Sequence, residues 1–262
     1  MKSAKILREK LESGQVILGI MTTFHLWLDL IEIAIKAGLD YLIIDTEHVG
    51  HDHELIADGC AFGRRSDFPV LIRPPQTEYA AVHTAADLGP CGLLLPMVES
   101  ARQLDEAQQG IRMPPRGRRR PGGWAMRWSS SVDFQTVKTS LEDDFIVIPQ
   151  IESPEGLSNV AAIAAHELTT ALGIGPYDLS ARLGVCWRSD FSELNEPVAK
   201  IRKAAEEVNK RMWIIGDPDL LMEEGFRFLC VGDPIAILES TMTQTVNRLR
   251  DGSTTKGART RG

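Results

Sequence analysis

Short apolar runs recur along the chain, and turn-forming residues precede each of them. The runs are rich in branched side chains and lack the polar alternation of a half-exposed strand, which predicts strands that are buried on both faces. Eight such strands are expected, at residues 16–20, 41–45, 69–73, 92–97, 145–151, 168–174, 212–215 and 227–231.

Stretches with helical apolar spacing lie between these runs, at residues 28–37, 53–64, 77–88, 100–110, 154–165, 193–210, 217–224 and 234–249. Regular alternation of buried strands with amphipathic helices predicts parallel strands joined by right-handed crossovers. Eight such units close into a (β/α)8 TIM barrel, the fold class expected here, and a doubly wound open sheet is the competing fold.

One segment interrupts the alternation. Residues 112–144 contain PPRGRRRPGGWAMRWSSS, which indicates a long inserted loop with some helix. Residues 251–262 (DGSTTKGARTRG) are expected to be a disordered C-terminal tail. Because no Gly/Ser or Pro-rich linker divides the interior, residues 1–250 are expected to form a single barrel domain.

Composition narrows the function classes. The chain has 262 residues and a formal net charge of −7, which argues against a general nucleic-acid binder. No apolar run approaches the roughly 20 residues of a membrane span, and the charged N-terminus lacks the apolar core of a signal peptide, so a cytoplasmic location is expected. The cysteines have no CxxC spacing and are expected to be buried, reduced thiols: Cys60, Cys91, Cys186 and Cys230.

Polar residues follow four of the expected strands. In a barrel, chemistry takes place on the loops at the C-terminal ends of the strands, so these residues are expected to share one rim. They are Asp45-Thr46-Glu47-His48, Arg73-Pro74-Pro75, Gln150-Ile151-Glu152 and the turn GIGPYD at residues 173–178.

Glu152 and Asp178 are two carboxylates on neighbouring strand ends. Hard oxygen ligands favour Mg²⁺ or Mn²⁺ over Zn²⁺, and Co²⁺ is a further candidate. The alternative is that each residue only caps a helix, and local sequence alone favours capping. Their common placement on one rim shifts the balance toward a shared metal ion.

The GIGPYD turn places Gly175 and small neighbours at a helix start. Such a turn can present backbone N–H groups to a substrate carboxylate. A tight turn that needs glycine for backbone reasons explains the same sequence equally well.

His48 follows two acids, and a partnership with Asp45 would fix its tautomer and make it a general base. The spacing of His48, His51 and His53 also permits a zinc site, but no cysteine or spaced acid completes a ligand pattern.

Arg73, at the end of an apolar strand, needs an anionic partner. That partner is either Asp45 or Glu47 in a structural ion pair, or a substrate whose developing oxygen charge it stabilises. A second group of arginines lies in the inserted loop and is interpreted as a loop over the active site that meets an anionic substrate, with an RNA-binding patch as the alternative: Arg112, Arg116, Arg118, Arg119 and Arg120.

The ordered motifs YLIIDTEH, PVLIRPP, GLLLPMVES, PPRGRR, IPQIESPEGL, GIGPYDLSARLG and GFRFLCVGD resemble the HpcH/HpaI aldolase family over about residues 14–240. The resemblance implies a class II, metal-dependent aldolase that cleaves 4-hydroxy-2-oxo acids to pyruvate and an aldehyde, and runs the reverse addition. Family members are commonly hexamers that exchange the last helix between subunits, so a homo-oligomer is implied.

Residue roles also follow from the resemblance. It implies His48 as general base, Arg73 as the enolate-stabilising arginine and Asp87 as the residue that raises the basicity of the histidine. Glu152 and Asp178 match the metal ligands. Gln150 and Tyr177 match substrate-contacting positions, with the backbone N–H of Tyr177 at the pyruvyl carboxylate.

Two alternatives remain open on the sequence. Oxaloacetate decarboxylation, or another enolpyruvate reaction such as that of acyl-CoA ester lyases, would use the same metal and arginine. A non-catalytic barrel that binds anions or RNA is the alternative from another class. The aldehyde half of the substrate is undetermined, because Arg120 and Pro121 and the loop with His25 and Trp27 depart from the family pattern.

Overall fold

The computed structural model describes residues 1–120, 122–128, 133–185 and 192–250. Its strands form one closed, parallel barrel in chain order, and the last strand pairs with the first. This confirms the predicted TIM barrel and excludes the open sheet. The strands are β1 (Ile17–Thr22), β2 (Tyr41–Asp45), β3 (Val70–Arg73), β4 (Gly92–Leu95), β5 (Ile146–Ile151), β6 (Ala171–Ile174), β7 (Arg211–Ile215) and β8 (Phe228–Cys230).

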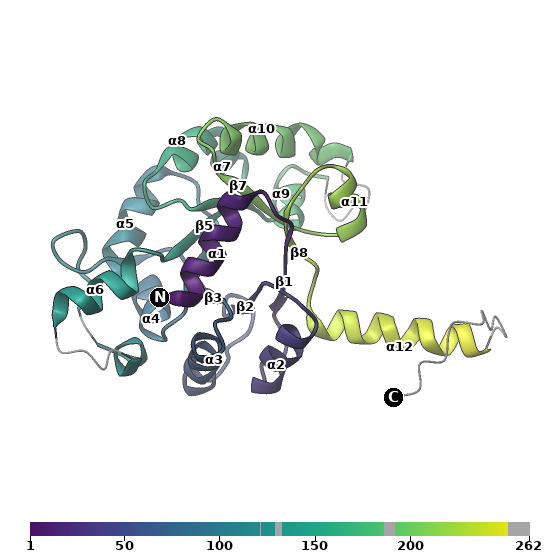
Figure 1. Cartoon of the computed structure of the whole chain (residues 1–262). Coiled ribbons are helices and arrows are strands. Elements are labelled where there is room, and N and C mark those ends of the chain that lie inside the picture. The colour runs from purple at the N-terminus through teal and green to yellow at the C-terminus, as the bar shows by residue number, and fades with distance from the viewer. Residues whose placement is uncertain (121, 129–132, 186–191, 251–262) are drawn as a thin grey trace.

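Helices surround the barrel (Figure 1). In the described residues they are α1 (Lys2–Ser13), α2 (Leu28–Lys36), α3 (His53–Arg65), α4 (Tyr79–Asp87), α5 (Ala101–Ile111), α6 (Phe134–Glu142), α7 (Pro154–Ser158), α8 (Val160–Ala165), α9 (Pro176–Arg182), α10 (Asn195–Glu206), α11 (Pro218–Glu223) and α12 (Pro234–Arg250), with 3-10 turns at Trp124–Trp128 and Ser192–Leu194. The sequence pattern missed α1 and merged α7 with α8, and it anticipated only the start of α9, at the GIGPYD turn.

The barrel interior is filled by large side chains. Trp213 donates a hydrogen bond from Nε1 to Tyr41 Oη at 2.8 Å, and Tyr41 Oη donates to the carbonyl of Leu229 at 2.8 Å. Gly19 makes room for this ring, because a Cβ there would lie 2.4 Å from it. A second apolar layer packs between the outer face of the strands and the helices.

Helix α1 closes the N-terminal end of the barrel. Its buried residues Leu7 and Leu11 belong to the same apolar cluster as Ile17 and Trp213 inside the barrel. The opposite, C-terminal end is therefore the open end.

Helix α12 differs from the other barrel helices, because it projects away from the barrel and has no buried residue (Figure 1). No helix in the described part of the chain is long and apolar enough to cross a membrane. Cys60, Cys91 and Cys230 are buried free thiols, as expected. Cys186 and the expected tail at 251–262 lie outside the described residues.

Candidate active site at the C-terminal ends of the strands

The strand ends bring the expected polar residues to one rim. Asp45 ends β2 directly opposite Arg73 at the end of β3. Ile151 and Ile174 are opposite each other on β5 and β6, so Glu152 and Gly175 follow side by side. The placement predicted from the sequence is what parallel barrel strands produce.

Asp45 and Arg73 form a buried, two-point ion pair. Arg73 donates from Nε to Asp45 Oδ1 at 2.8 Å and from Nη2 to Oδ2 at 2.6 Å, and its Nη1 lies 3.2 Å from Glu47 Oε2. Burial raises the pKa of Asp45, but the hydrogen bonds and charge of Arg73 outweigh burial and hold the pKa below its ordinary value. Arg73 thus has a structural partner and a fixed orientation at the mouth of the barrel.

His48 lies in the loop after β2, with 53% of its side chain exposed. Its Nε2 is 4.0 Å from Glu47 Oε2. The expected Asp45–His48 partnership is not formed in the described residues, because both oxygens of Asp45 are occupied by Arg73. Asp45 therefore orients the arginine rather than the histidine.

Glu152 is a buried carboxylate, with only 2% of the residue exposed. The backbone N–H of Met97 donates to its Oε2 at 2.9 Å. Burial, together with the negative charges of Glu47 and Asp178, raises the pKa of Glu152 to about 8. A carboxylate in such a position is stabilised in its ionised form by a bound cation.

The surroundings of Glu152 fit a divalent ion. Asp178, exposed at the start of α9, and Glu47 are the other acids whose charge reaches it. A Cβ at Gly175 would lie 2.0 Å from Glu152 Oε1, so only glycine allows the carboxylate this position. No group of three or more His, Cys, Asp and Glu side chains in the described ranges is arranged to hold a metal. Two protein carboxylates would therefore leave coordination positions for water and substrate oxygens.

Gln150 and Tyr177 flank these acids. Gln150, on β5, is buried, and its Oε1 has no hydrogen-bond partner in the described structure. Tyr177 lies at the start of α9 with its side chain half exposed. A buried amide oxygen without a partner costs free energy unless a ligand or water satisfies it, which is consistent with a substrate contact.

Asp87 lies at the end of α4 and contacts residues other than His48. Arg119 donates from Nε to Asp87 Oδ1 at 2.9 Å, and His83 Nε2 is 3.6 Å from Oδ2. Within one chain, the described contacts of Asp87 give no support for its expected influence on His48.

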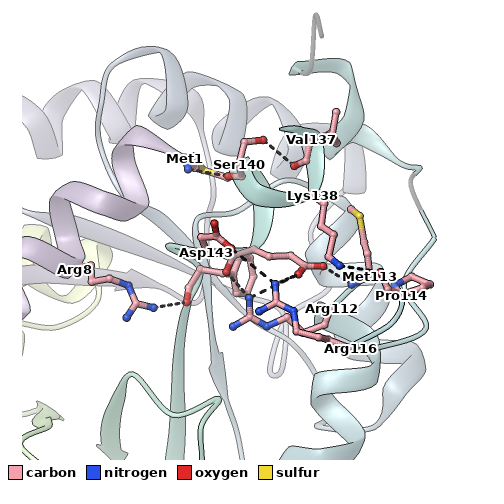
Figure 2. Close-up of polar contacts among 12 residues, drawn as sticks. Met1, Arg8, Arg112, Met113, Pro114, Arg116, Val137, Lys138, Ser140 and Asp143 are labelled. Atoms are coloured by element: carbon pink, nitrogen blue, oxygen red, sulfur yellow. Dashed lines mark hydrogen bonds and ion pairs between the residues drawn. The ribbon is translucent and has the colours of Figure 1, made fainter. Parts of the chain in front are cut away.

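The arginine-rich loop is used mainly inside the protein. Arg112 and Arg116 donate to the carbonyl and carboxylate of Glu142, each at 2.5 Å, and the backbone N–H of Met113 also bonds the fully buried carboxylate (Figure 2). Arg119 is buried against Asp87, and Arg118 stacks on Tyr79. Because Arg112, Arg116, Arg118 and Arg119 all contact other parts of the chain, their interpretation as substrate or RNA contacts is not supported. Arg120, the fifth arginine of the loop, is exposed and has no described contact.

His51 and His53 do not join His48. They line a separate cavity of about 370 Å³ between α3 and α4 with apolar neighbours such as Ile56. The three-histidine zinc site considered from the sequence is not formed among the described residues.

Sequence reasoning missed the contribution of Met97, and it considered Glu47 only as a rim acid and a possible ion-pair partner of Arg73. Glu47 is half-buried, and burial raises its pKa, opposed by the charges of Arg73 and His48. Met97 adopts a left-handed backbone with φ 50°, which aims its N–H at Glu152. The rim position of Glu47 was a usable signal, whereas a strained backbone at a methionine has no signature in the sequence.

Comparison with known proteins identifies the family of this chain. The family model described as HpcH/HpaI aldolase/citrate lyase matches residues 27–227. A protein named hydroxypyruvate/pyruvate aldolase from Pseudomonas aeruginosa is 30% identical over 94% of this chain and 93% of its own length. One of the same name from Delftia acidovorans is 31% identical over 84% of this chain and 83% of its own.

Among solved structures, an HpcH/HpaI aldolase from Desulfitobacterium hafniense superposes with a TM-score of 0.85, at 26% identity over 94% of this chain and 96% of that one. The family match covers most of the barrel and includes all of the rim residues described above. The chain belongs to the HpcH/HpaI aldolase/citrate lyase family and is a carbon–carbon lyase.

Proposed function

We propose that this protein is a metal-dependent aldolase that reversibly cleaves a 4-hydroxy-2-oxo acid to an aldehyde and pyruvate or a close 2-oxo acid. The proposal rests mainly on the burial and charge environment of Glu152. It is a buried carboxylate whose pKa is raised to about 8, and it faces a second acid on the same rim as a fixed arginine. Such a group is expected where a cation is bound.

The cation would be held by Glu152 and Asp178, and it supplies Lewis acidity toward the oxygens of a bound 2-oxo acid. Two carboxylates and no cysteine favour Mg²⁺ or Mn²⁺ as the native ion, with Co²⁺ as a further candidate. A solved relative of the fold from Mycobacterium tuberculosis, named CitE, is described as a complex with magnesium and pyruvate.

The chain's own residues complete the reaction. In cleavage, His48 accepts the proton of the 4-hydroxyl group, the C3–C4 bond breaks, and its electron pair moves into the C2–C3 bond of the departing enolate. Arg73, oriented by Asp45, stabilises the negative charge on the C2 oxygen. Transfer of that proton from His48 to C3, directly or through water, then yields the 2-oxo acid and restores the base. The backbone N–H at Tyr177 is proposed to hold the carboxylate end of the substrate, and Gln150, whose free Oε1 accepts a hydrogen bond, is proposed to contact a hydroxyl group or water of the bound substrate.

The aldehyde half of the substrate would lie toward the first loop of the barrel, after β1. Phe24 and His25 are exposed there, and Trp27 is half-buried beside them. The relatives named hydroxypyruvate/pyruvate aldolases support hydroxypyruvate, in addition to pyruvate, as the 2-oxo acid partner.

The test is release of pyruvate from 4-hydroxy-2-oxo acids, followed through lactate dehydrogenase, with Mg²⁺ or Mn²⁺ added and again with EDTA. We expect turnover only with metal. Glu152→Gln and Asp178→Asn should each lower kcat/KM by at least about a hundredfold. The matched variants Glu155→Gln and Asp219→Asn, which alter exposed acids in the first turns of α7 and α11, should leave it unchanged.

Oxaloacetate is assayed in parallel, because decarboxylation would need the same cation and arginine. Metal-dependent loss of CO2 from oxaloacetate without any aldol cleavage would replace the proposed reaction by decarboxylation. Salt-sensitive RNA binding without any turnover would instead favour the non-catalytic alternative.

We further propose that the protein works as a homo-oligomer, and a hexamer by resemblance to its family. Support comes from α12, which has no buried residue and exposes Ile237, Leu238 and Met242 to solvent. An apolar helix face of this kind is stabilised when it packs on another subunit.

A further inference from the structure

A large cavity lies at the end of the barrel opposite to the rim of Glu152 and Arg73. Its volume is about 870 Å³, within the range of small-molecule sites. It is lined by residues that precede or begin β6, β7 and β8, together with parts of α1 and α10. In Figure 1, α1 lies in front of the barrel beside β7.

The lining of this cavity is strongly cationic. Five basic side chains face two acids, Glu12 and Glu206, although the chain as a whole carries a formal charge of −7. In the described residues none of the five makes an ion pair within the protein. They are Arg8, Arg202, Lys210, Arg211 and Arg227.

Backbone carbonyl groups hold these cations in place. Arg211 donates from Nε to the carbonyl of Leu11 at 2.9 Å, and Arg202 donates from Nη1 to that of Glu224 at 3.0 Å. Arg8 donates from Nη2 to the carbonyl of Phe145 at 3.1 Å (Figure 2). A carbonyl fixes the position of a guanidinium group but does not neutralise its charge.

Donors remain after these bonds are counted. A guanidinium carries five N–H groups, and Arg211 and Arg202 each use one nitrogen. Arg8 Nε is buried and has no hydrogen-bond partner in the described structure. The residues that line the cavity therefore retain unused N–H donors as well as positive charge.

A purely structural role explains only part of this arrangement. Lys210 Nζ bonds the carbonyl of Ala164 at the end of α8, and Arg227 Nη1 bonds that of Met222 at the end of α11. Such bonds satisfy carbonyl groups at helix C-termini. They do not explain why five cations converge on one cavity with only two acids among them.

We propose that this cavity binds a small, multiply charged oxyanion, such as a phosphorylated or polycarboxylate metabolite. Arginine donors match the oxygens of phosphate and carboxylate groups, often two at a time. Arg202 covers a face of the Phe226 ring, with its Cζ 4.0 Å from the ring centre. The proposed ligand therefore needs no nucleobase to stack on that face. This second site is independent of the aldolase site at the other end of the barrel.

The test is calorimetric titration of the full-length protein with pyrophosphate and, separately, with citrate, in buffer containing EDTA. The paired variant Arg202→Gln/Arg211→Gln removes two lining cations. Its matched control, Arg102→Gln/Lys200→Gln, removes two exposed cations that do not line the cavity. We expect the unmodified protein to bind at least one probe, and the paired variant to bind it at least about tenfold more weakly than the control does.

The stronger of the two probes distinguishes a phosphate ligand from a polycarboxylate. Failure of the unmodified protein to bind either probe, or any smaller difference between the two variants, overturns the proposal. Arg202→Lys/Arg211→Lys, which keeps both charges, should recover part of the affinity even if the glutamine pair loosens the fold. Binding should be unchanged in Glu152→Gln, and a loss there would place the anion at the other end of the barrel.

Discussion

Arg73 and Asp45 act as one unit at the mouth of the barrel. The strand register places them opposite each other, and two hydrogen bonds fix the guanidinium plane. A lysine could not reproduce both bonds, because it offers a single point charge rather than a planar fork. The proposed role of Arg73 toward an oxyanion therefore depends on a carboxylate whose two oxygens both bond the arginine.

Asp45→Asn is expected to lower the free energy of unfolding by roughly 3 kcal/mol at neutral pH, because it leaves Arg73 buried beside a neutral partner. The pKa of Asp45 is lowered in the folded protein, so its ionised form adds stability above its unfolded pKa of about 3.9. That contribution is lost as pH falls through the folded pKa.

Urea denaturation at several pH values tests this expectation. The difference between Asp45→Asn and the unmodified protein should be largest near pH 7 and should shrink below about pH 4. Asp58→Asn, at an exposed position of α3, serves as control and should show little difference at any pH. A constant difference across the range would contradict the ion-pair account.

At the scale of elements, α6 and the arginine-rich loop stabilise each other through Glu142. This fully buried carboxylate accepts bonds from Met113 and Arg116, and Arg112 bonds its carbonyl. Lys138 adds a bond from α6 to the carbonyl of Pro114 at 2.9 Å (Figure 2). The composition of this loop is typical of a solvent-exposed segment, but bonds to one buried acid fix its position.

Glu142→Gln should destabilise the protein by about 2–4 kcal/mol, since Arg116 would lose its charged partner and the amide would satisfy fewer donors. Limited proteolysis should then cleave within residues 112–120 faster than in the unmodified protein. Asp143→Asn is the matched control, because this neighbouring acid is 54% exposed and lies 3.8 Å from Arg116. Equal protease sensitivity of the two variants would argue against the anchoring role.

Sequence patterns predicted the eight strands because each is a continuous apolar run buried on both faces. They missed α1, whose role as the closing element depends on Leu7 and Leu11 reaching the barrel interior. They also missed the contacts that the loop arginines make with Glu142 and Asp87. A run of arginines has the same composition whether it faces solvent or a buried acid 20 to 30 residues away, and only tertiary contacts separate the two cases.

The candidate site was predictable to a similar extent. The rim positions of Glu152, Asp178 and Arg73 follow from strand order alone. The contact expected between Asp45 and His48 was wrong. Asp45 bonds Arg73, which lies opposite it on the neighbouring strand, instead of the histidine that is close to it in sequence. Cross-strand pairing decides the contact, and a single sequence does not display it.

For the whole molecule, α12 is a helix that has no buried residue within the described single chain. Its exposed apolar residues include Leu238 and Met242, which lie on one side of the helix at helical spacing. Burying this face in an oligomer would make stability depend on protein concentration.

Leu238→Glu/Met242→Glu should therefore convert an oligomer into smaller species, as measured by size-exclusion chromatography with light scattering. The control Ser240→Glu/Asn247→Glu adds the same charge away from that face and should keep the oligomer intact. A monomeric unmodified protein at micromolar concentration would contradict the oligomer proposal directly.

The hydrogen-bonded chain from Trp213 through Tyr41 to Leu229 joins β7, β2 and β8 inside the barrel. The indole of Trp213 and the phenol of Tyr41 are two ultraviolet chromophores in contact inside the molecule. Their ultraviolet absorption and emission depend on a dry interior and on strands that are distant in the chain. The part of these signals that Trp213 contributes, measured as the difference from Trp213→Phe because the chain has five tryptophans, thus monitors closure of the barrel.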